Sequence, residues 1–303
     1  MKGFSLIATA LCLLYLCQEV SSFQLAQPVL KATIDTGNLS RKSIQATKFI
    51  KQEKVQSLRP PHILSASATD SEGGGESPSK LDTDALAKYA GALVIQVGLI
   101  AGLFTGLDKL VAAFDIQVPF ALNCFGFYAV ALKSRIFNPL SNKRPQTENK
   151  EIEGAQERKM PNWTPPGFIF PIVWLLLIGP LRAFSTSLIY DTTGSYAHPA
   201  ILSLMLHLSI GDIWNTINNV ERRYGASVLG VLCVWISAAF AAFNYYQVLP
   251  LAGQLLSLKL IWLTIASSLI FQTWRLNPDP ETGKKDALMP TIGGDAKTEF
   301  MWF

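Results

Sequence analysis

Six apolar stretches, each close to the length of a membrane-crossing helix, dominate the chain after residue 84. A helix needs about 20 mainly apolar residues to cross a hydrocarbon core of about 30 Å. Charged residues make up 16% of the chain, whereas soluble domains carry about a quarter. We therefore predict an all-α fold, an integral membrane helical bundle. The apolar stretches cover residues 85–104 (continuing to 114), 118–136, 168–190, 199–217, 226–248 and 251–274.

The charges between these stretches predict how the chain crosses the membrane. Lys and Arg occur in the 138–165 loop, in the loop between the fourth and fifth stretches and after the sixth, but not in 191–198 or 248–252. Such alternation follows the positive-inside rule. We expect five or six transmembrane helices, and favour six because six keep both ends of the bundle on the basic side. Asn123 and Lys133 interrupt stretch 118–136, which makes it the candidate for a short or partly inserted helix.

The N-terminus carries the features of a targeting leader. Lys2 precedes an apolar run over 4–17 that is too short for an ordinary span, and Val20 and Ser22 fit a cleavage site before Phe23. Residues 23–66 are basic, hydroxylated and poor in acids, as transit peptides are. This arrangement resembles the bipartite leader of proteins sent to secondary plastids of algae, and predicts a multi-pass protein of a plastid membrane. The alternative is a secreted or endomembrane protein with a disordered N-terminus.

The domain organisation follows from these features. Residues 67–80 are rich in Gly and Ser and are expected to form a disordered linker. We predict a signal peptide over 1–22, a transit-peptide-like segment over 23–66, N-terminal hydrophobic helices over 81–137, a charged loop over 138–164, a helical core over 165–277 and a C-terminal tail over 278–303.

One stretch of sequence is similar to a known family. Residues 160–174 read MPNWTPPGFIFPIVW, and their Trp and Pro spacing resembles the start of the second helix in the TspO/MBR family of tryptophan-rich sensory and translocator proteins. Trp214, residues 245–248, Trp262 and residues 274–277 match later helices in order. The resemblance covers about 160–278, four of the family's five helices, and 85–104 is the candidate for the first. The residues of the first motif are Pro161, Trp163, Pro165, Pro166, Phe170, Pro171 and Trp174.

The departures from the family pattern put its usual ligand in doubt. Met160 replaces the family's Lys, Gly211 replaces the third-helix Asn, and Leu258 and Lys259 replace the fifth-helix Pro-Tyr pair. Phe271 replaces the Tyr of the cholesterol-type motif, which is weak even when complete. We therefore do not expect sterol binding.

The resemblance implies a pocket between the helices that accepts tetrapyrroles, such as a porphyrin or haem, and other hydrophobic molecules. Trp174, Trp214 and Trp262 lie in predicted spans, where an indole can stack on a planar ligand or pack between helices. We give Trp174 less weight than the other two. Trp163 is either an anchor at the membrane interface or part of a lid. His207 could ligate a metal held in a tetrapyrrole, although a lone buried His is more often structural.

Two cations within the spans are separate candidates, and they come from the residues alone. Arg182 lies eight residues before the end of stretch 168–190, and Lys259 lies eight residues after the start of 251–274. At 1.5 Å per residue both lie about 12 Å below the same membrane surface. They would repel each other unless an anion, such as a tetrapyrrole carboxylate or a lipid headgroup, lay between them. The alternative is that both side chains snorkel outwards.

Other features bound the function. Asp212 is expected to bond a neighbour such as Asn215 or a group on another helix. There is no nucleophile–base pair, phosphate-binding loop or Cys/His metal spacing, so we predict no catalytic residues, no enzyme, no metal and no required cofactor. The expected partners are the lipid bilayer and a hydrophobic small molecule, with a homodimer as a candidate assembly and no nucleic acid. We predict ligand binding for sensing, buffering or transfer; the alternatives are a transporter of small anionic or amphipathic molecules, or a structural or assembly factor of a photosynthetic complex.

Overall fold

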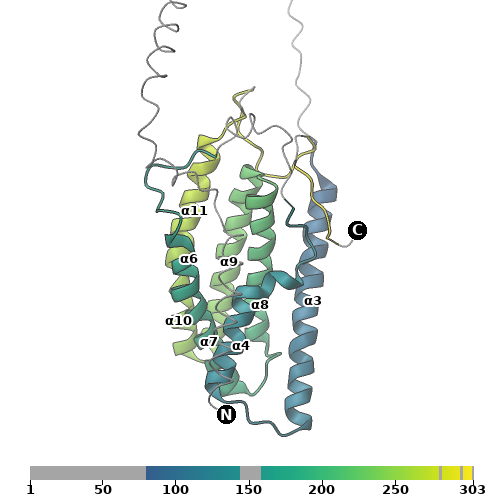
Figure 1. The fold of residues 1–303 in the computed structure, drawn as a ribbon, viewed down its shortest axis with the longest axis vertical. Coiled ribbons are helices and arrows are strands. Elements are labelled where there is room, and N and C mark those ends of the chain that lie inside the picture. The colour runs from purple at the N-terminus through teal and green to yellow at the C-terminus, as the bar shows by residue number, and fades with distance from the viewer. Residues whose placement is uncertain (1–79, 144–157, 280–281, 294–295, 302–303) are drawn as a thin grey trace, which may run out of the picture. The chain divides into compact units, whose positions relative to one another are not determined.

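The computed structural model describes residues 80–143, 158–279, 282–293 and 296–301 (Figure 1). The predicted signal peptide, transit-peptide-like segment and nearly all of the linker lie outside the described residues, as does the middle of the charged loop. Residues Ser79–Phe303 form one compact unit, and helices account for most of it. The prediction of an all-helical bundle is confirmed.

Five helical stretches of the described chain are long and apolar enough to cross a membrane. Two of them contain a π-helical turn, and the last is divided at Leu258. They are α3 (Thr83–Ala113); α6 (Ile169–Val173) with η3 (Trp174–Ile178) and α7 (Gly179–Thr193); α8 (Pro199–Asn215) with η4 (Thr216–Val220); α9 (Tyr224–Val248); and α10 (Pro250–Ser257) with α11 (Lys259–Leu276).

The second apolar stretch does not form a full span. It folds into α4 (Phe120–Lys133), followed by one 3₁₀ turn, η2 (Ser134–Phe137). The 14 residues of α4 reach about 21 Å at 1.5 Å per residue, short of the hydrocarbon core. Pro119, in an extended conformation, precedes the helix, and Asn138 ends the 3₁₀ turn. The preference for six full spans is therefore corrected to five, with one shorter helix.

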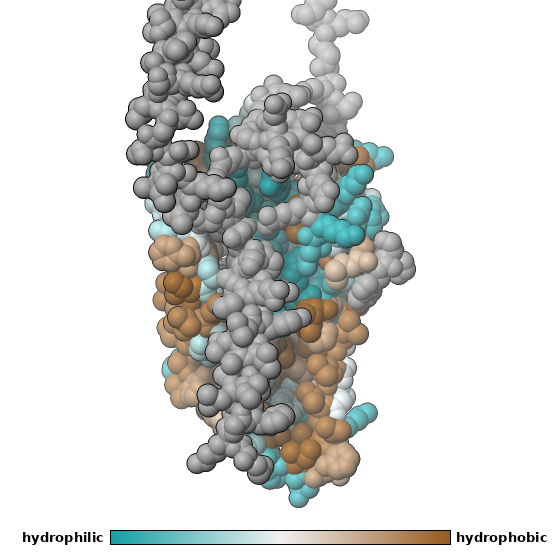
Figure 2. Space-filling view, in the orientation of Figure 1, coloured by the Kyte–Doolittle hydropathy of each residue, from teal (hydrophilic) through white to brown (hydrophobic). Residues whose placement is uncertain are grey.

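The chain nevertheless returns to the same end of the bundle. The Ile292 amide donates to the Lys80 carbonyl at 2.8 Å, which places the two described ends together. At the other end, the Asp108 carboxylate accepts from the Ser195 hydroxyl and the Tyr196 amide at 2.7 and 2.6 Å. The loops with few basic residues therefore meet at one end and the basic loops at the other, as the charge pattern predicts. Figure 2 shows hydrophobic residues over the middle and lower part of the visible face, with hydrophilic residues at its upper end and a smaller group at its lower tip.

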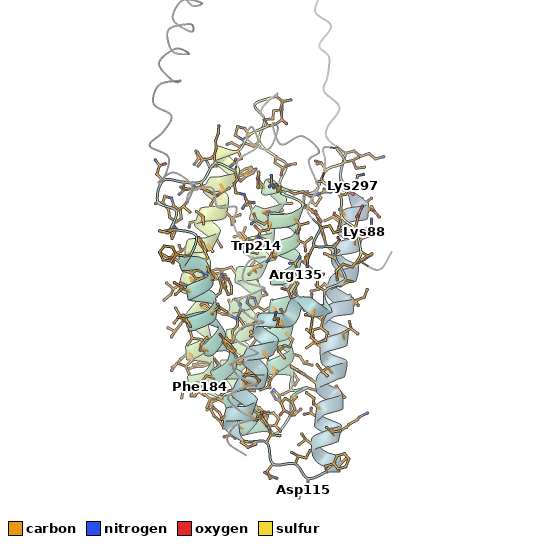
Figure 3. All side chains as sticks on the ribbon, in the orientation of Figure 1. Lys88, Asp115, Arg135, Phe184, Trp214 and Lys297 are labelled. Carbon is orange, nitrogen blue, oxygen red and sulfur yellow. The ribbon has the colours of Figure 1, made fainter. Side chains whose placement is uncertain are left out.

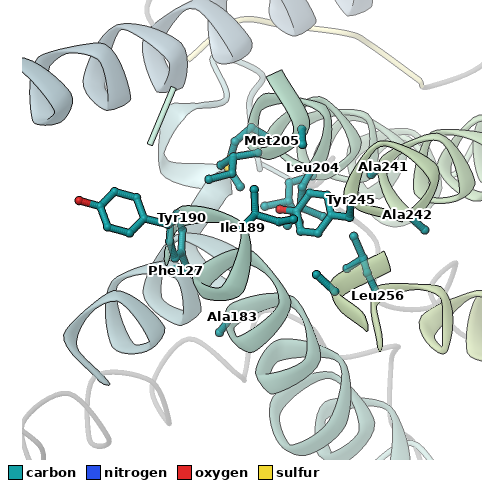
Figure 4. Close-up of a cluster of buried hydrophobic side chains, with 14 of the residues drawn as sticks. Phe127, Ala183, Ile189, Tyr190, Leu204, Met205, Ala241, Ala242, Tyr245 and Leu256 are labelled. Atoms are coloured by element: carbon teal, nitrogen blue, oxygen red, sulfur yellow. The ribbon is translucent and has the colours of Figure 1, made fainter. Parts of the chain in front are cut away.

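Helix α8 belongs to the most deeply buried of the five long helical stretches. It packs against α3 and α9, while α9 also packs against α10 and α11, and α7 packs against α4 and α10. Ile189, Leu204, Tyr245 and Leu256 form part of the largest buried cluster (Figure 4). Since lipid is as apolar as these side chains, such a core is stabilised by close packing rather than by exclusion of water. Gly253 shows how close: an added Cβ would lie 2.5 Å from the Tyr246 backbone.

The C-terminal tail, residues 278–301 as far as they are described, folds back over the basic end. Leu81 and Thr291 form an antiparallel bridge, as do Leu140 and Phe300. The Trp274 indole donates to the Asp286 carbonyl at 2.8 Å. The tail therefore joins the start of α3, the chain after η2 and the end of α11.

Candidate functional site

Three basic side chains from three helices meet inside the bundle. Arg182 on α7 is 6% exposed, and His207 on α8 and Lys259 at the start of α11 are each 1% exposed. Arg182 Nη2 lies 3.3 Å from His207 Nε2, and Lys259 is near enough to act electrostatically on both. We call Arg182, His207 and Lys259 the basic cluster. The structure thus brings together the two cations whose depths matched in the sequence, and neither reaches the surface as snorkelling requires.

The hydrogen bonds around His207 define its protonation. The Ser237 hydroxyl donates its single proton to the Val234 carbonyl at 3.0 Å, so its oxygen accepts from His207 Nδ1, which lies 3.0 Å away. A guanidinium only donates, so His207 Nε2 accepts from Arg182. His207 is therefore a neutral imidazole with its proton on Nδ1. The Nε2 lone pair that a metal would need is occupied by Arg182.

Two donors of the cluster are left without partners among the described residues. Lys259 Nζ and Arg182 Nε are both buried and make no hydrogen bond there. Buried charges are normally paired, because desolvation otherwise costs several kcal/mol. Arg182 is partly stabilised by Trp174, whose ring centre lies 4.9 Å from the guanidinium carbon. Lys259 has no comparable contact with any residue that the structure describes, so the cluster is positioned to bind an anion.

A second polar group, centred on Asp212, lies on the same helix. Asp212 Oδ2 accepts from Gln96 Nε2 of α3 and from the Ser134 hydroxyl of η2, both at 2.7 Å. Arg135 Nη1 donates to the Asp212 backbone carbonyl at 3.1 Å. We call Gln96, Ser134, Arg135 and Asp212 the aspartate network. Figure 3 places Arg135 and Trp214 within the bundle, between Lys88 near one end and Asp115 at the other.

The side chain of Asp212 bonds groups on other helices, Gln96 and Ser134, rather than Asn215. The sequence reasoning missed Gln96, Ser134 and Arg135, although each is a polar residue in or beside an apolar stretch, which was the available signal. Asp212 also acts electrostatically on Arg182. The network therefore connects the basic cluster to α3 and η2.

The predicted tryptophans occupy different places. Trp174 lies against the basic cluster, under the Arg182 guanidinium. The Trp214 indole donates to the Ser227 carbonyl at 3.1 Å and packs over Gly230 of α9. Trp262 packs edge-on against Phe170, with 5.7 Å between ring centres. Trp163 is 43% exposed and its indole donates to Gln272 Oε1 at 2.7 Å. Trp174 therefore contacts Arg182 of the basic cluster, whereas Trp214, Trp262 and Trp163 have the other partners named here; which of these rings meets a ligand stays a prediction.

A third polar group fastens the basic end. Glu221 accepts from the Tyr89 hydroxyl, and from the Thr298 hydroxyl at 3.0 Å, while Arg223 bonds Asp82 at 2.8 Å. Burial raises the pKa of the Glu221 carboxyl above its ordinary value. The Asp82 pKa is lowered, chiefly by the hydrogen bond from the Ala85 amide. We call Asp82, Tyr89, Glu221, Arg223 and Thr298 the basic-end clasp; it lies outside the apolar interior and is structural.

No three His, Cys, Asp or Glu side chains gather as a metal site would need, within the part of the chain that the structure describes. The polar groups there are suited to hold an anion and an apolar body beside it, not to activate a nucleophile.

Comparison with known proteins decides the family. Residues 140–275 match the TspO/MBR family model. This region belongs to the TspO/MBR family. It contains Arg182, His207, Asp212 and Lys259, whereas Gln96 and most of α3 and α4 precede it. The aspartate network therefore joins the TspO/MBR region to the helices before it.

Three relatives of known name illustrate the similarity. Protein CrtK of Rhodobacter capsulatus is 27% identical over 128 residues, which are 40% of this chain and 76% of that protein. The translocator protein of Homo sapiens is 29% identical over 128 residues, 41% of this chain and 75% of that protein. The tryptophan-rich sensory protein of Cereibacter sphaeroides is 27% identical over 128 residues, which are 42% of this chain and 79% of that protein. TspO/MBR translocator proteins are membrane proteins and not enzymes, which agrees with the prediction that the chain is not an enzyme.

Proposed function

We propose that the protein binds a hydrophobic molecule with an acidic group, such as a tetrapyrrole, inside its helical bundle, for sensing, buffering or transfer in a plastid membrane. One observation carries the proposal: Lys259 Nζ is buried within the bundle and has no hydrogen-bond partner among the described residues. An ionisable residue inside a span is costly and points to a functional role. A bound carboxylate would compensate this charge.

Each member of the site has a distinct proposed role. Lys259 and Arg182 hold the acidic group, and His207 positions Arg182 through its Nε2. Trp174, already stacked under Arg182, offers its ring to the apolar body of the ligand. Trp214, Trp262 and Trp163 remain candidates for a more distant part of the wall, and Trp163 is the exposed one.

One observation favours transport as a second function. Polar groups follow one another from the basic end to the basic cluster: Arg135 bonds the exposed Asn142 and the Asp212 backbone, and Asp212 acts on Arg182. A path of this kind would let an anion move between the surface and the interior. Flux into reconstituted vesicles tests it, since a binding protein saturates without moving its ligand.

The plastid location rests on the leader, which lies outside the described residues. We expect residues 1–80 fused to a fluorescent protein to direct it to the plastid in an alga with a secondary plastid. Secretion of the fusion, or retention in the endomembranes, contradicts this part of the proposal.

The test of binding is a titration of the full chain in detergent with protoporphyrin IX, followed by tryptophan fluorescence. We expect saturable quenching that Lys259→Gln and Trp174→Phe weaken. Trp214→Phe and Trp262→Phe report whether the ligand extends towards those rings. Lys109→Gln, at an exposed position of α3, is the matched control and should bind as the unmodified chain does.

Equal quenching in every variant, or quenching that never saturates, would contradict binding at this site. Co-purification with a photosynthetic complex in place of binding would then favour the assembly role.

A further inference from the structure

We propose that Gly211 selects the ligand by size: its missing side chain keeps a space open beside the basic cluster, where the body of a broad, flat ligand lies against the α8 backbone. This inference rests on the proposed function, because it assumes that a ligand enters the bundle. It adds a residue that determines which ligands fit, which the basic cluster alone does not provide.

Close packing does not explain the glycine at this position. At Gly230 an added Cβ would lie 2.8 Å from Trp214 Cδ1, so that glycine lets a side chain approach its helix. At Gly211 an added Cβ would meet no described atom within 4 Å. Glycine in the middle of a helix is less stable than alanine, and no packing contact in the described part of the chain offsets that loss for Gly211.

The space at Gly211 lies inside the bundle. Several other described glycines have equally free surroundings, but all of those are exposed, whereas Gly211 is half-buried. Within the described stretch 200–220, which is α8 without its first residue and η4, no residue is exposed. His207, one turn before Gly211, is 1% exposed. Gly211 therefore borders a gap between helices and not the outer surface of the bundle.

The space is next to the basic cluster. Gly211 follows His207 by four residues, which places the two on one face of α8, about 6 Å apart along its axis. Arg182 Nη2 lies 3.3 Å from His207 Nε2 on the same helix face. The cluster therefore lies about one helical turn further from the basic end than the space does.

The neighbouring span leaves room at this level. Helices α7 and α8 run in opposite directions, so η3, which precedes α7, lies beside the part of α8 that follows His207. Helix α7 packs on α8, whereas η3, among the described elements, packs closely only on its neighbours in the chain, α6 and α7. A π-helical turn within an α-helix is frequently found at functional sites. Trp174, the ring under Arg182, is the first residue of η3, so we place the space between α8 and η3.

These surroundings favour a broad, flat ligand. Glycine allows a ligand to approach the helix backbone closely, and Trp174 offers an aromatic face on which a planar ring can stack. The acidic group of such a ligand would point towards Arg182, and its ring would cover Gly211. A tetrapyrrole has this shape.

The experiment fills the space in two steps and measures the binding of protoporphyrin IX to the full chain in detergent by tryptophan fluorescence. We expect Gly211→Ala to weaken binding about threefold and Gly211→Leu about tenfold or more, because each added group occupies volume that the ring needs. The matched control is Gly102→Leu on α3. Gly102 has equally free surroundings but is exposed, so this variant should bind as the unmodified chain does.

Thermal unfolding without ligand tests the space itself. Because no described atom lies near the Cβ position of Gly211, Gly211→Ala should unfold at or above the midpoint of the unmodified chain. A lower midpoint would show that another group fills the space, and would overturn the inference. If Gly211→Leu fails to fold, the comparison of binding rests on Gly211→Ala.

The binding outcomes separate the inference from the proposed function. If Gly211→Leu binds as tightly as the unmodified chain while Lys259→Gln weakens binding, the inference fails and the proposed function stands. An equal loss in Gly102→Leu also overturns the inference, because the effect would then not depend on the space. If Gly211→Leu weakens binding and Lys259→Gln does not, the inference holds and the proposed role of Lys259 fails. If the unmodified chain shows no saturable quenching, both fail.

Discussion

Arg182 donates to His207 across the α7–α8 interface at 3.3 Å, so the imidazole nitrogen that a metal would need instead supports a cation. The imidazole is held from its other side by Ser237. The guanidinium is therefore fixed before any ligand arrives, with its Nε–H still free among the described residues. Fixed donors of this kind bind an anion without a cost of reorganisation.

Removing the charge of Lys259 should stabilise the protein without ligand. Lys259→Met retains the length of the side chain and removes a buried amine that makes no hydrogen bond among the described residues, so we expect a gain in stability of about 1–3 kcal/mol. Thermal unfolding in detergent measures it. Lys109→Met, on the exposed side of α3, should change the midpoint little. A loss of stability in Lys259→Met would show that the ammonium has a favourable partner.

Breaking the aspartate network should have the opposite effect. Gln96 is fully buried and donates both to Asp212 and to the Ser134 carbonyl. Gln96→Leu leaves both acceptors short of a donor, and we expect a loss of about 1–3 kcal/mol. The control is Gln254→Leu, at an exposed position of α10. Equal thermal unfolding midpoints for the two variants would show that the hydrogen bonds of Gln96 contribute nothing to stability.

The contact between Trp214 and Gly230 predicts a packing defect. A Cβ on Gly230 would lie 2.8 Å from Trp214 Cδ1, so Gly230→Ala must displace the indole, at a cost of about 1–3 kcal/mol. Gly211→Ala is matched, since its Cβ would meet nothing within 4 Å. We expect Gly230→Ala to lower the unfolding midpoint and shift the tryptophan emission, and Gly211→Ala to do neither. A lower unfolding midpoint for Gly211→Ala than for Gly230→Ala would contradict the contact between Trp214 and Gly230.

The basic-end clasp should make stability depend on pH. The pKa of Glu221 is raised in the folded protein by burial, so its contribution is fully present below the unfolded value, about 4.3, and is lost as pH rises through the folded pKa. Relative to Glu221→Gln, the unmodified chain should therefore lose stability as pH increases above about 4.3. Unfolding midpoints of both proteins across a pH series measure this. A constant difference between them would contradict the raised pKa.

Some of this architecture follows directly from the sequence. Arg182 and Lys259 could be placed at one depth because helix rise is constant and each span has a recognisable end. Their meeting could not be predicted, because it depends on which helices are neighbours. The partners of Asp212 escaped prediction for the same reason: Gln96 lies 116 residues away along the chain. Asn123 and Lys133 predict that the 118–136 helix is short, but hydropathy does not show that Pro119 and Asn138 set the ends of its helical turns.

The tail that folds back over the basic end sets an order of events during synthesis. The amide of Ile292 bonds the carbonyl of Lys80, so the first described helix is fastened by residues that are synthesised after α11. All five long helices must be made before this closure, and contacts between residues so far apart form late. A nascent chain that stops after α11 would therefore contain all five long helices, but the start of α3 would lack its contacts with the tail. We expect such a chain to be cleaved by protease near Thr83 faster than the full chain.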